Sequence, residues 1–306
     1  MLSLGGISQV LAEAPEGLPF RIKEVEIEFH NTELDLLLVV PYPMKRNLPA
    51  VVFLPGLMAD VDQYQSYAED LAARGILVAI HPWYSLLMPD VELAQNAKRI
   101  SEWLTATLRV DGARIGIAGH SMGAKDAVLA QGLYGGFEAI VAIDPDDSGE
   151  VSAIEPYTRS LTIPLLLIGA ELGWDAPDFC APMDKNYQRF FEQSPPGTLE
   201  MTLIGADHVL MLDDPERLGY NLCRSGWADP ASVHAEALTA MGLFFEEHLK
   251  VRRNSIPRLP GKAIRVRGDQ GPEPLGPPGV RVPAEELPSD RSEESGNQPG
   301  SSASGS

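Results

Sequence analysis

The residues best suited to chemistry lie in the pentapeptide Gly-His-Ser-Met-Gly, residues 119–123. It follows an apolar run of strand length, residues 114–118, and precedes a stretch of helical period, residues 124–133. Glycines on both sides of a serine allow a sharp strand-to-helix turn that lifts the hydroxyl to the carboxyl edge of a sheet. A helix N-terminus at that point stabilises developing negative charge. The pattern predicts Ser121 as a nucleophile.

A serine hydroxyl is a poor nucleophile at neutral pH until a base takes its proton, so a histidine is needed nearby. The chain contains six histidines, and His208 is the one that lies on a loop directly after the last predicted strand, residues 200–204. Both the chain order and the position after that strand are typical of the base in such sites. We therefore predict His208 as the base.

The third residue must be a carboxylate that fixes the tautomer of the imidazole. Asp144 directly ends the apolar run of residues 139–143, whereas Glu171 and Asp175 follow the next run, residues 164–168. Either strand end can reach the histidine in a parallel sheet. Asp144 is the preferred acid because it terminates its strand and precedes a proline, with Asp175 and Glu171 as alternatives.

An ester carbonyl attacked by serine becomes an oxyanion, which needs two backbone N–H donors. One is expected from Met122, the residue after the nucleophile, and the other from Leu57, which follows Gly56 in the loop after the third strand. Apolar side chains at neighbouring strand ends are candidate substrate contacts, although each is equally explained by packing under loops. These candidates are Met58, Trp83, Tyr84, Trp174 and Phe179.

The elements that must position these residues alternate along the chain between strand-length apolar runs and longer stretches of helical period. Such alternation is typical of a mostly parallel sheet with helices on both faces. The eight predicted strands are residues 24–29, 34–40, 50–54, 76–80, 114–118, 139–143, 164–168 and 200–204. The five predicted helices are residues 63–73, 91–108, 124–133, 183–191 and 231–249. The sequence thus predicts an α/β protein with a doubly wound sheet.

Composition divides the chain in two. We predict one catalytic domain over residues 1–250 and a disordered tail over residues 251–306, which is rich in Pro, Gly and Ser and ends in a Gly/Ser-rich stretch.

The chain has 24 basic and 43 acidic residues, a net charge of −19. This charge excludes a general nucleic-acid binder, which would be basic, and suits a neutral small-molecule substrate. We recognise no membrane-spanning run and no signal peptide, so a cytoplasmic location is expected.

Several segments resemble one known family. The elbow over residues 119–125 is similar to Gly-His-Ser-Arg-Gly-Gly-Lys, and residues 143–145 match Ile-Asp-Pro. Residues 169–173 resemble Gly-x-Gly-Leu-Gly, residues 180–182 match Cys-Ala-Pro, and residues 207–214 are similar to Gly-His-Met-Asp-Met-Leu-Asp-Asp. With these segments the chain resembles the chlorophyllase branch of the α/β-hydrolase fold from about residue 48 to residue 249.

The resemblance implies an ester hydrolase that cleaves the phytyl ester of chlorophyll to chlorophyllide and phytol, with Asp144 as the acid and no cofactor or metal. It departs from the family at Met122, where chlorophyllases have Arg, and at residues 209–210, so the substrate can differ. A broader carboxylesterase or cutinase-like polyester hydrolase is the alternative, and a non-catalytic homologue that binds an apolar ligand is a further one. Cys180 and Cys223 both match family positions, so a disulfide and two buried thiols both stay open, as does the oligomeric state.

Overall fold

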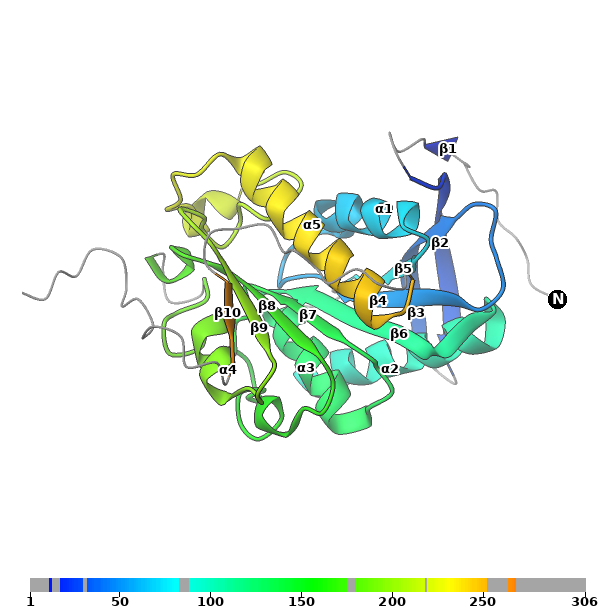
Figure 1. Ribbon diagram of the computed structural model, residues 1–306, viewed down its shortest axis with the longest axis horizontal. Helices are drawn as coiled ribbons and strands as arrows, with labels where there is room; N and C mark the ends of the chain where they lie inside the picture. Colours follow the sequence, from blue (N-terminus) through cyan, green and yellow to red (C-terminus); the bar gives the residue numbers. More distant parts are fainter. Residues whose placement is uncertain are drawn as a thin grey trace, which may run out of the picture. The chain divides into compact units, whose positions relative to one another are not determined.

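One sheet carries every strand of the described chain (Figure 1). The computed structural model describes residues 11–12, 17–29, 32–82, 88–175, 180–217, 219–251 and 264–267. Within them the strand order is β1-β2-β3-β5-β4-β6-β7-β8-β9-β10. The strands are β1 (Leu11–Ala12), β2 (Phe20–Phe29), β3 (Thr32–Pro41), β4 (Leu48–Leu54), β5 (Leu77–Ile80), β6 (Val110–His120), β7 (Ile140–Ile143), β8 (Leu165–Ala170), β9 (Leu199–Leu203) and β10 (Ile264–Val266).

Six strands, from β5 through β4, β6, β7 and β8 to β9, are parallel, whereas β1, β2, β3 and β10 join antiparallel. Parallel strands need crossover connections, and the apolar runs of β4, β5, β7 and β8 are buried throughout, as expected for a sheet covered on both faces. Their carboxyl ends share one edge. The loops that hold the predicted site residues therefore meet there.

Helices cover both faces of the sheet (Figure 1). Side chains alternate between the two faces along each strand, so the core consists of two clusters, one on each face of the sheet. In β4, Val51 and Phe53 pack into one cluster, while Ala50 and Val52 pack into the other. The first cluster includes α1 and α5, and the second includes α2, α3 and part of α4. The helices are α1 (Gln65–Ala73), α2 (Asp90–Thr107), α3 (Met122–Tyr134), α4 (Tyr187–Gln193) and α5 (Pro230–His248). Short 3-10 turns are η1 (Val61–Tyr64), η2 (Thr158–Ser160), η3 (Gly173–Asp175) and η4 (Tyr220–Cys223).

All eight predicted strands and all five predicted helices are present, with small shifts at their ends. Two short strands were not predicted, β1 and β10. The strand β10 lies within the predicted tail and pairs antiparallel with β9, so that Ile264 faces Met201 across the register. Of the predicted tail, residue 251 and residues 264–267 are described, so the division at residue 250 stays a prediction.

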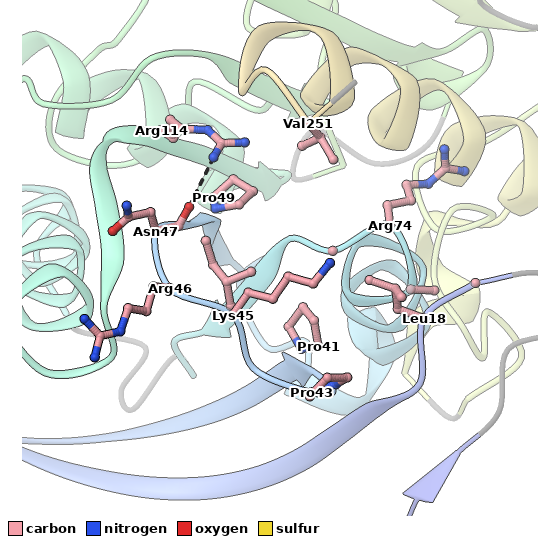
Figure 2. A pocket seen from close by; sticks show the side chains of 14 residues that line it. Leu18, Pro41, Pro43, Lys45, Arg46, Asn47, Pro49, Arg74, Arg114 and Val251 are labelled. Atoms are coloured by element: carbon pink, nitrogen blue, oxygen red, sulfur yellow. Dashed lines mark hydrogen bonds between the residues drawn. The ribbon is translucent and has the colours of Figure 1, made fainter. Parts of the chain in front are cut away.

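A cavity of about 630 Å³ opens at the amino ends of β4 and β5, at the opposite edge from the predicted site. Figure 2 shows the side chains that line it. Arg114 lies on its wall and donates hydrogen bonds to the backbone carbonyls of Asn47, Leu249 and Lys250. These bonds link the end of α5 to β6. No predicted site residue is among those that line the cavity. In the described part of the chain, none of the helices is long and apolar enough to cross a membrane.

Candidate active site

The nucleophile turn forms as the motif predicts. Ser121 joins β6 to α3 with φ of 57° and ψ of −129°, a conformation that an ordinary residue adopts only under local strain. The glycines on both sides are required by close backbone approach. A Cβ on Gly119 would lie 2.4 Å from the carbonyl oxygen of Gly123, and a Cβ on Gly123 would lie 2.2 Å from that of Pro55. The Ser121 side chain caps no backbone group of α3, so its hydroxyl stays available.

The structure brings Ser121, His208 and Asp144 together from the ends of β6, β9 and β7. Nε2 of His208 lies 2.9 Å from Oγ of Ser121, and Nδ1 of His208 lies 2.7 Å from Oδ2 of Asp144. The other carboxylate oxygen of Asp144 accepts the backbone N–H of Ala170 at 3.0 Å. All three side chains are buried. This is the hydrogen-bond order in which a base withdraws a serine proton and a carboxylate orients the base.

The surroundings of His208 favour its protonated form. Burial alone disfavours a charge on the ring, but the hydrogen bond to Asp144 and the negative charge of Asp144 outweigh it. The pKa of His208 is therefore raised above its ordinary value. A raised pKa makes the imidazole a stronger base, and the imidazolium formed after proton transfer is stabilised at the same place.

The alternative acids are engaged elsewhere or not described. The carboxylate of Glu171 accepts the backbone N–H of Gly205 at 2.7 Å, which holds the turn after β9. The backbone of Asp175 ends η3, and its side chain lies outside the described residues. Gly173 leaves room for Asp144, because a Cβ there would lie 2.7 Å from Oδ2 of Asp144. The geometry thus favours Asp144 as the partner of the imidazole.

The two expected oxyanion donors lie beside the nucleophile. Met122 is the first residue of α3, where backbone N–H groups have no partner within the helix. Gly56 is packed against the nucleophile, since a Cβ on it would lie 3.1 Å from Cβ of Ser121. Leu57 follows directly, and its side chain and that of Met58 are exposed, Met58 by 70%. These two side chains therefore present apolar surface on the loop after β4.

The remaining predicted substrate contacts are only partly described. Trp174 lies in η3, next to the glycine that faces Asp144, and is half-buried. Trp83, Tyr84 and Phe179 lie outside the described residues. Among the residues that are described, no group of three or more His, Cys, Asp or Glu side chains could hold a metal ion.

Sequence reasoning missed the residue that fixes the base loop. Asp207 is fully buried, and its carboxylate accepts four backbone N–H groups, with Arg224 at 3.3 Å. The four donors are Val209, Leu210, Ser225 and Gly226. A carboxylate directly before a predicted catalytic histidine was a signal that could have found it, because a loop needs such acceptors for its own N–H groups.

Buried Lys125 and a disulfide tie down the neighbouring loops. Lys125 donates to the backbone carbonyl of Ser148 at 2.7 Å and pairs with Asp90 at 2.7 Å, which holds the loop after Asp144 against α2 and α3. Cys180 and Cys223 form a disulfide with Cα atoms 5.7 Å apart, linking the segment after β8 to η4. Of the two alternatives for the cysteines, the structure has the pair.

Comparison with known proteins points to one family. The model of the chlorophyllase family matches residues 17–255. The chain is 24% identical over 226 residues to chlorophyllase type 0 of Chenopodium album, covering 64% of this chain and 63% of that protein. It is 24% identical over 210 residues to chlorophyllase-1 of Arabidopsis thaliana, covering 58% and 65%. The chain thus spans less than two thirds of the length of these relatives.

Related ester hydrolases also match. Cutinase est1 of Thermobifida alba is 25% identical over 164 residues, covering 51% of this chain and 52% of that protein. Among solved structures, a ferulic acid esterase from Streptomyces cinnamoneus superposes with a TM-score of 0.61 at 21% identity, covering 78% of this chain and 89% of that one. This superposition and the sheet topology show the α/β-hydrolase fold. The match over residues 17–255 goes further: the chain belongs to the chlorophyllase family.

Proposed function

We propose that this protein is a carboxylic-ester hydrolase that works through a covalent acyl-enzyme. Ser121 is the nucleophile, His208 the base and Asp144 the acid that orients the base. The observation that carries the proposal is the continuous contact from Oγ of Ser121 through the imidazole to the buried carboxylate, at 2.9 and 2.7 Å. The family match and the ester hydrolases among its relatives support the same chemistry.

The proposed cycle follows from these contacts. Nε2 of His208 takes the Ser121 proton as Oγ bonds to the ester carbonyl carbon, and the amides of Leu57 and Met122 stabilise the resulting oxyanion. Collapse of the tetrahedral intermediate breaks the bond to the alcohol oxygen, which receives the proton from His208. A water activated by the same imidazole then attacks the acyl-enzyme. Its hydrolysis releases the acid and returns the proton to Ser121.

For the substrate we propose a chlorophyllase-like activity, cleavage of the phytyl ester of chlorophyll to chlorophyllide and phytol. The match to the chlorophyllase family supports it. The apolar, exposed Leu57 and Met58 beside the nucleophile suit a long hydrocarbon alcohol. The second candidate is a broader or cutinase-like esterase. It is supported by the cutinase relatives and by Met122, which stands where the chlorophyllase elbow has Arg.

The test combines two substrates and two serine variants. Wild type is incubated with chlorophyll a and, in parallel, with a short p-nitrophenyl ester, and products are separated by chromatography. Ser121→Ala should lower the turnover of each accepted ester by about 10⁴-fold or more. Ser194→Ala is the matched control, because its exposed fraction of 6% is close to the 7% of Ser121 while its hydroxyl donates to the carbonyl of Phe191 in α4.

Each outcome assigns the function. Chlorophyllide formed by wild type and Ser194→Ala but not by Ser121→Ala establishes both substrate and nucleophile. Cleavage of the short ester alone keeps the mechanism and moves the substrate to the broader esterase. If wild type cleaves neither ester, the hydrolase proposal fails and an apolar-ligand-binding homologue takes its place.

A further inference from the structure

Two buried side chains outside the proposed cycle connect its parts. Tyr64, the last residue of η1, is 1% exposed, and His120, which precedes the nucleophile, is 3% exposed. The hydroxyl of Tyr64 lies 2.9 Å from the amide nitrogen of Gly56 and 3.0 Å from Nδ1 of His120. Nε2 of His120 lies 2.9 Å from the carbonyl oxygen of His208. The contacts form one chain from the loop after β4, through the nucleophile turn, to the base loop.

The direction of every hydrogen bond in this chain is determined by its two ends. The Gly56 amide can only donate, so the Tyr64 oxygen accepts from it. The His208 carbonyl can only accept, so Nε2 of His120 carries a proton. A neutral His120 then has a bare Nδ1, which accepts the proton of the Tyr64 hydroxyl. A second proton on His120 would leave that hydroxyl without an acceptor.

The surroundings hold both side chains in this neutral state. Burial, with a further contribution from nearby His208, keeps the pKa of His120 well below its ordinary value. Burial also raises the pKa of the Tyr64 hydroxyl well above its ordinary value. Neither group titrates near neutral pH, so the hydrogen-bond directions persist over the range in which His208 acts as a base.

The chain is also packed too closely for its members to move independently. A Cβ on Gly56 would lie 3.0 Å from Nδ1 of His120 and 3.2 Å from the Tyr64 hydroxyl. The rings of His120 and His208 have centroids 4.7 Å apart at an interplanar angle of 32°. A shift of the loop after β4 therefore presses on the same imidazole that holds the base loop.

We propose that Tyr64 and His120 are positioning residues that place the Leu57 amide and the His208 imidazole together against Ser121. Tyr64 fixes the position of the loop that carries the oxyanion donor by accepting the Gly56 amide. His120 bonds to both Tyr64 and the His208 carbonyl, so it couples the position of that loop to the backbone of the base. Neither touches substrate. The inference rests on the proposed ester hydrolysis, and part of its test is independent of turnover.

The first test removes one hydroxyl. Tyr64→Phe leaves the Gly56 amide without its acceptor, and kcat for the ester should fall by about 10- to 100-fold with KM unchanged within about twofold, because the oxyanion donor acts in the transition state. Tyr67→Phe is the matched control. Tyr67 is equally buried, but its hydroxyl donates to the Met211 carbonyl and not to His120. Its kcat should stay within about threefold of wild type at a comparable loss of thermal stability.

The second test separates the contributions of the two ring nitrogens of His120. His120→Asn keeps an acceptor for Tyr64 but loses the donor to His208, so the base loop relaxes away from Asp144 and the acid limb of the pH–rate profile moves to lower pH. His120→Gln keeps a donor in the place of Nε2, so the limb stays and kcat falls as in Tyr64→Phe. If His120 had a purely structural role, both variants would have a lower melting temperature, but their acid limbs would not differ.

Amide exchange makes the inference independent of turnover. Exchange of the Gly56 amide should accelerate by about tenfold or more in Tyr64→Phe and stay unchanged in Tyr67→Phe. Of these two variants, Tyr64→Phe should be the one in which the imidazole NMR signals of His208 shift. If wild type cleaves no ester, the proposed function fails, and these signals alone decide the positioning role. The inference is overturned when the exchange and the His208 signals do not change in Tyr64→Phe. In an active enzyme, kcat within about threefold of wild type for Tyr64→Phe, or an equal fall for Tyr67→Phe, also overturns it.

Discussion

Four of the seven described non-glycine residues with positive φ lie in loops at or beside the site of the proposed chemistry. Ser121 and Asp144 both have positive φ, 57° and 37°, and so do Met58 and Ala181 in neighbouring loops. Such conformations cost free energy in residues other than glycine and persist where the surroundings hold them. Asp144 is held by the Ala170 amide, by the His208 ring and by contact with Gly173. At the scale of single residues, the site is prearranged before any substrate binds.

The role of Asp144 predicts a change in both rate and pH dependence. The proposed hydrolysis needs neutral His208, whose pKa is raised, so kcat/KM of wild type should rise with pH through a midpoint above the ordinary value of about 6.5. Asp144→Asn removes the hydrogen-bonded charge that raises this pKa while burial still lowers it. We expect kcat to fall about 10³- to 10⁴-fold and the residual activity to have its acid limb at lower pH, measured with the short ester.

Glu171→Gln is the control for this prediction, since its carboxylate holds the Gly205 amide and not the imidazole. It should keep turnover within about tenfold of wild type and leave the acid limb in place. A near-normal rate for Asp144→Asn combined with a large loss for Glu171→Gln would transfer the acid role to Glu171.

At the scale of elements, one buried carboxylate, that of Asp207, holds the loop after β9 in place. Asp207 joins the turn that carries His208 to the segment before α5 by accepting backbone N–H groups from both. Loops lack the repeating hydrogen bonds of helices and strands, so a buried acceptor of this kind replaces them. His208 is thus placed by Asp207 through the backbone and by Asp144 through the ring.

Asp207→Ala should therefore destabilise the fold and misplace the base. Four buried donors lose their acceptor, so the free energy of unfolding in urea should fall by about 3 kcal/mol or more, and kcat of the remaining folded protein should fall. Asp229→Ala is a matched control at the N-cap of α5, where an exposed carboxylate accepts the Ser232 amide. It removes a single exposed helix cap, so it should destabilise the fold less than Asp207→Ala and leave kcat unchanged. Equal kcat in the two variants would contradict the positioning role of Asp207.

The junction of α2 and α3 contains a buried carboxylate that predicts a pH effect on stability. Burial raises the pKa of Asp126 to about 8, and nearby Lys125 only partly offsets it. Because this pKa exceeds the ordinary value of 3.8, the contribution of Asp126 to stability is lost as pH rises through about 8. Asp126→Asn should melt at higher temperature than wild type at about pH 9, and this advantage should shrink toward about pH 5. An advantage independent of pH would show that Asp126 does not titrate in the fold.

For the whole molecule, much of the fold was predictable because strand and helix periods are local. The elbow and the order of Ser121, Asp144 and His208 follow from positions at strand ends, which the topology of a parallel sheet brings to one edge. Tyr64 was not predictable, since its contact with His120 spans 56 residues and has no sequence pattern. β10 was missed because its three residues, Ile-Arg-Val, are too short to stand out from the predicted tail.

The disulfide acts on the unfolded state of the molecule, because it closes a loop between Cys180 and Cys223, 43 positions apart, that includes α4 and β9. In the chain-entropy account, closing such a loop destabilises the unfolded chain by about 4 kcal/mol. Thiol titration of the denatured, unreduced protein should find no free thiol, and finding two would contradict the pairing. Reduction should lower the melting temperature of wild type and leave the Cys180→Ser, Cys223→Ser double variant unchanged. Since the linked segments follow β8 and contain η4, reduction should also loosen the loops beside Asp144 and Asp207, so that kcat falls together with stability only in the protein that has the bond.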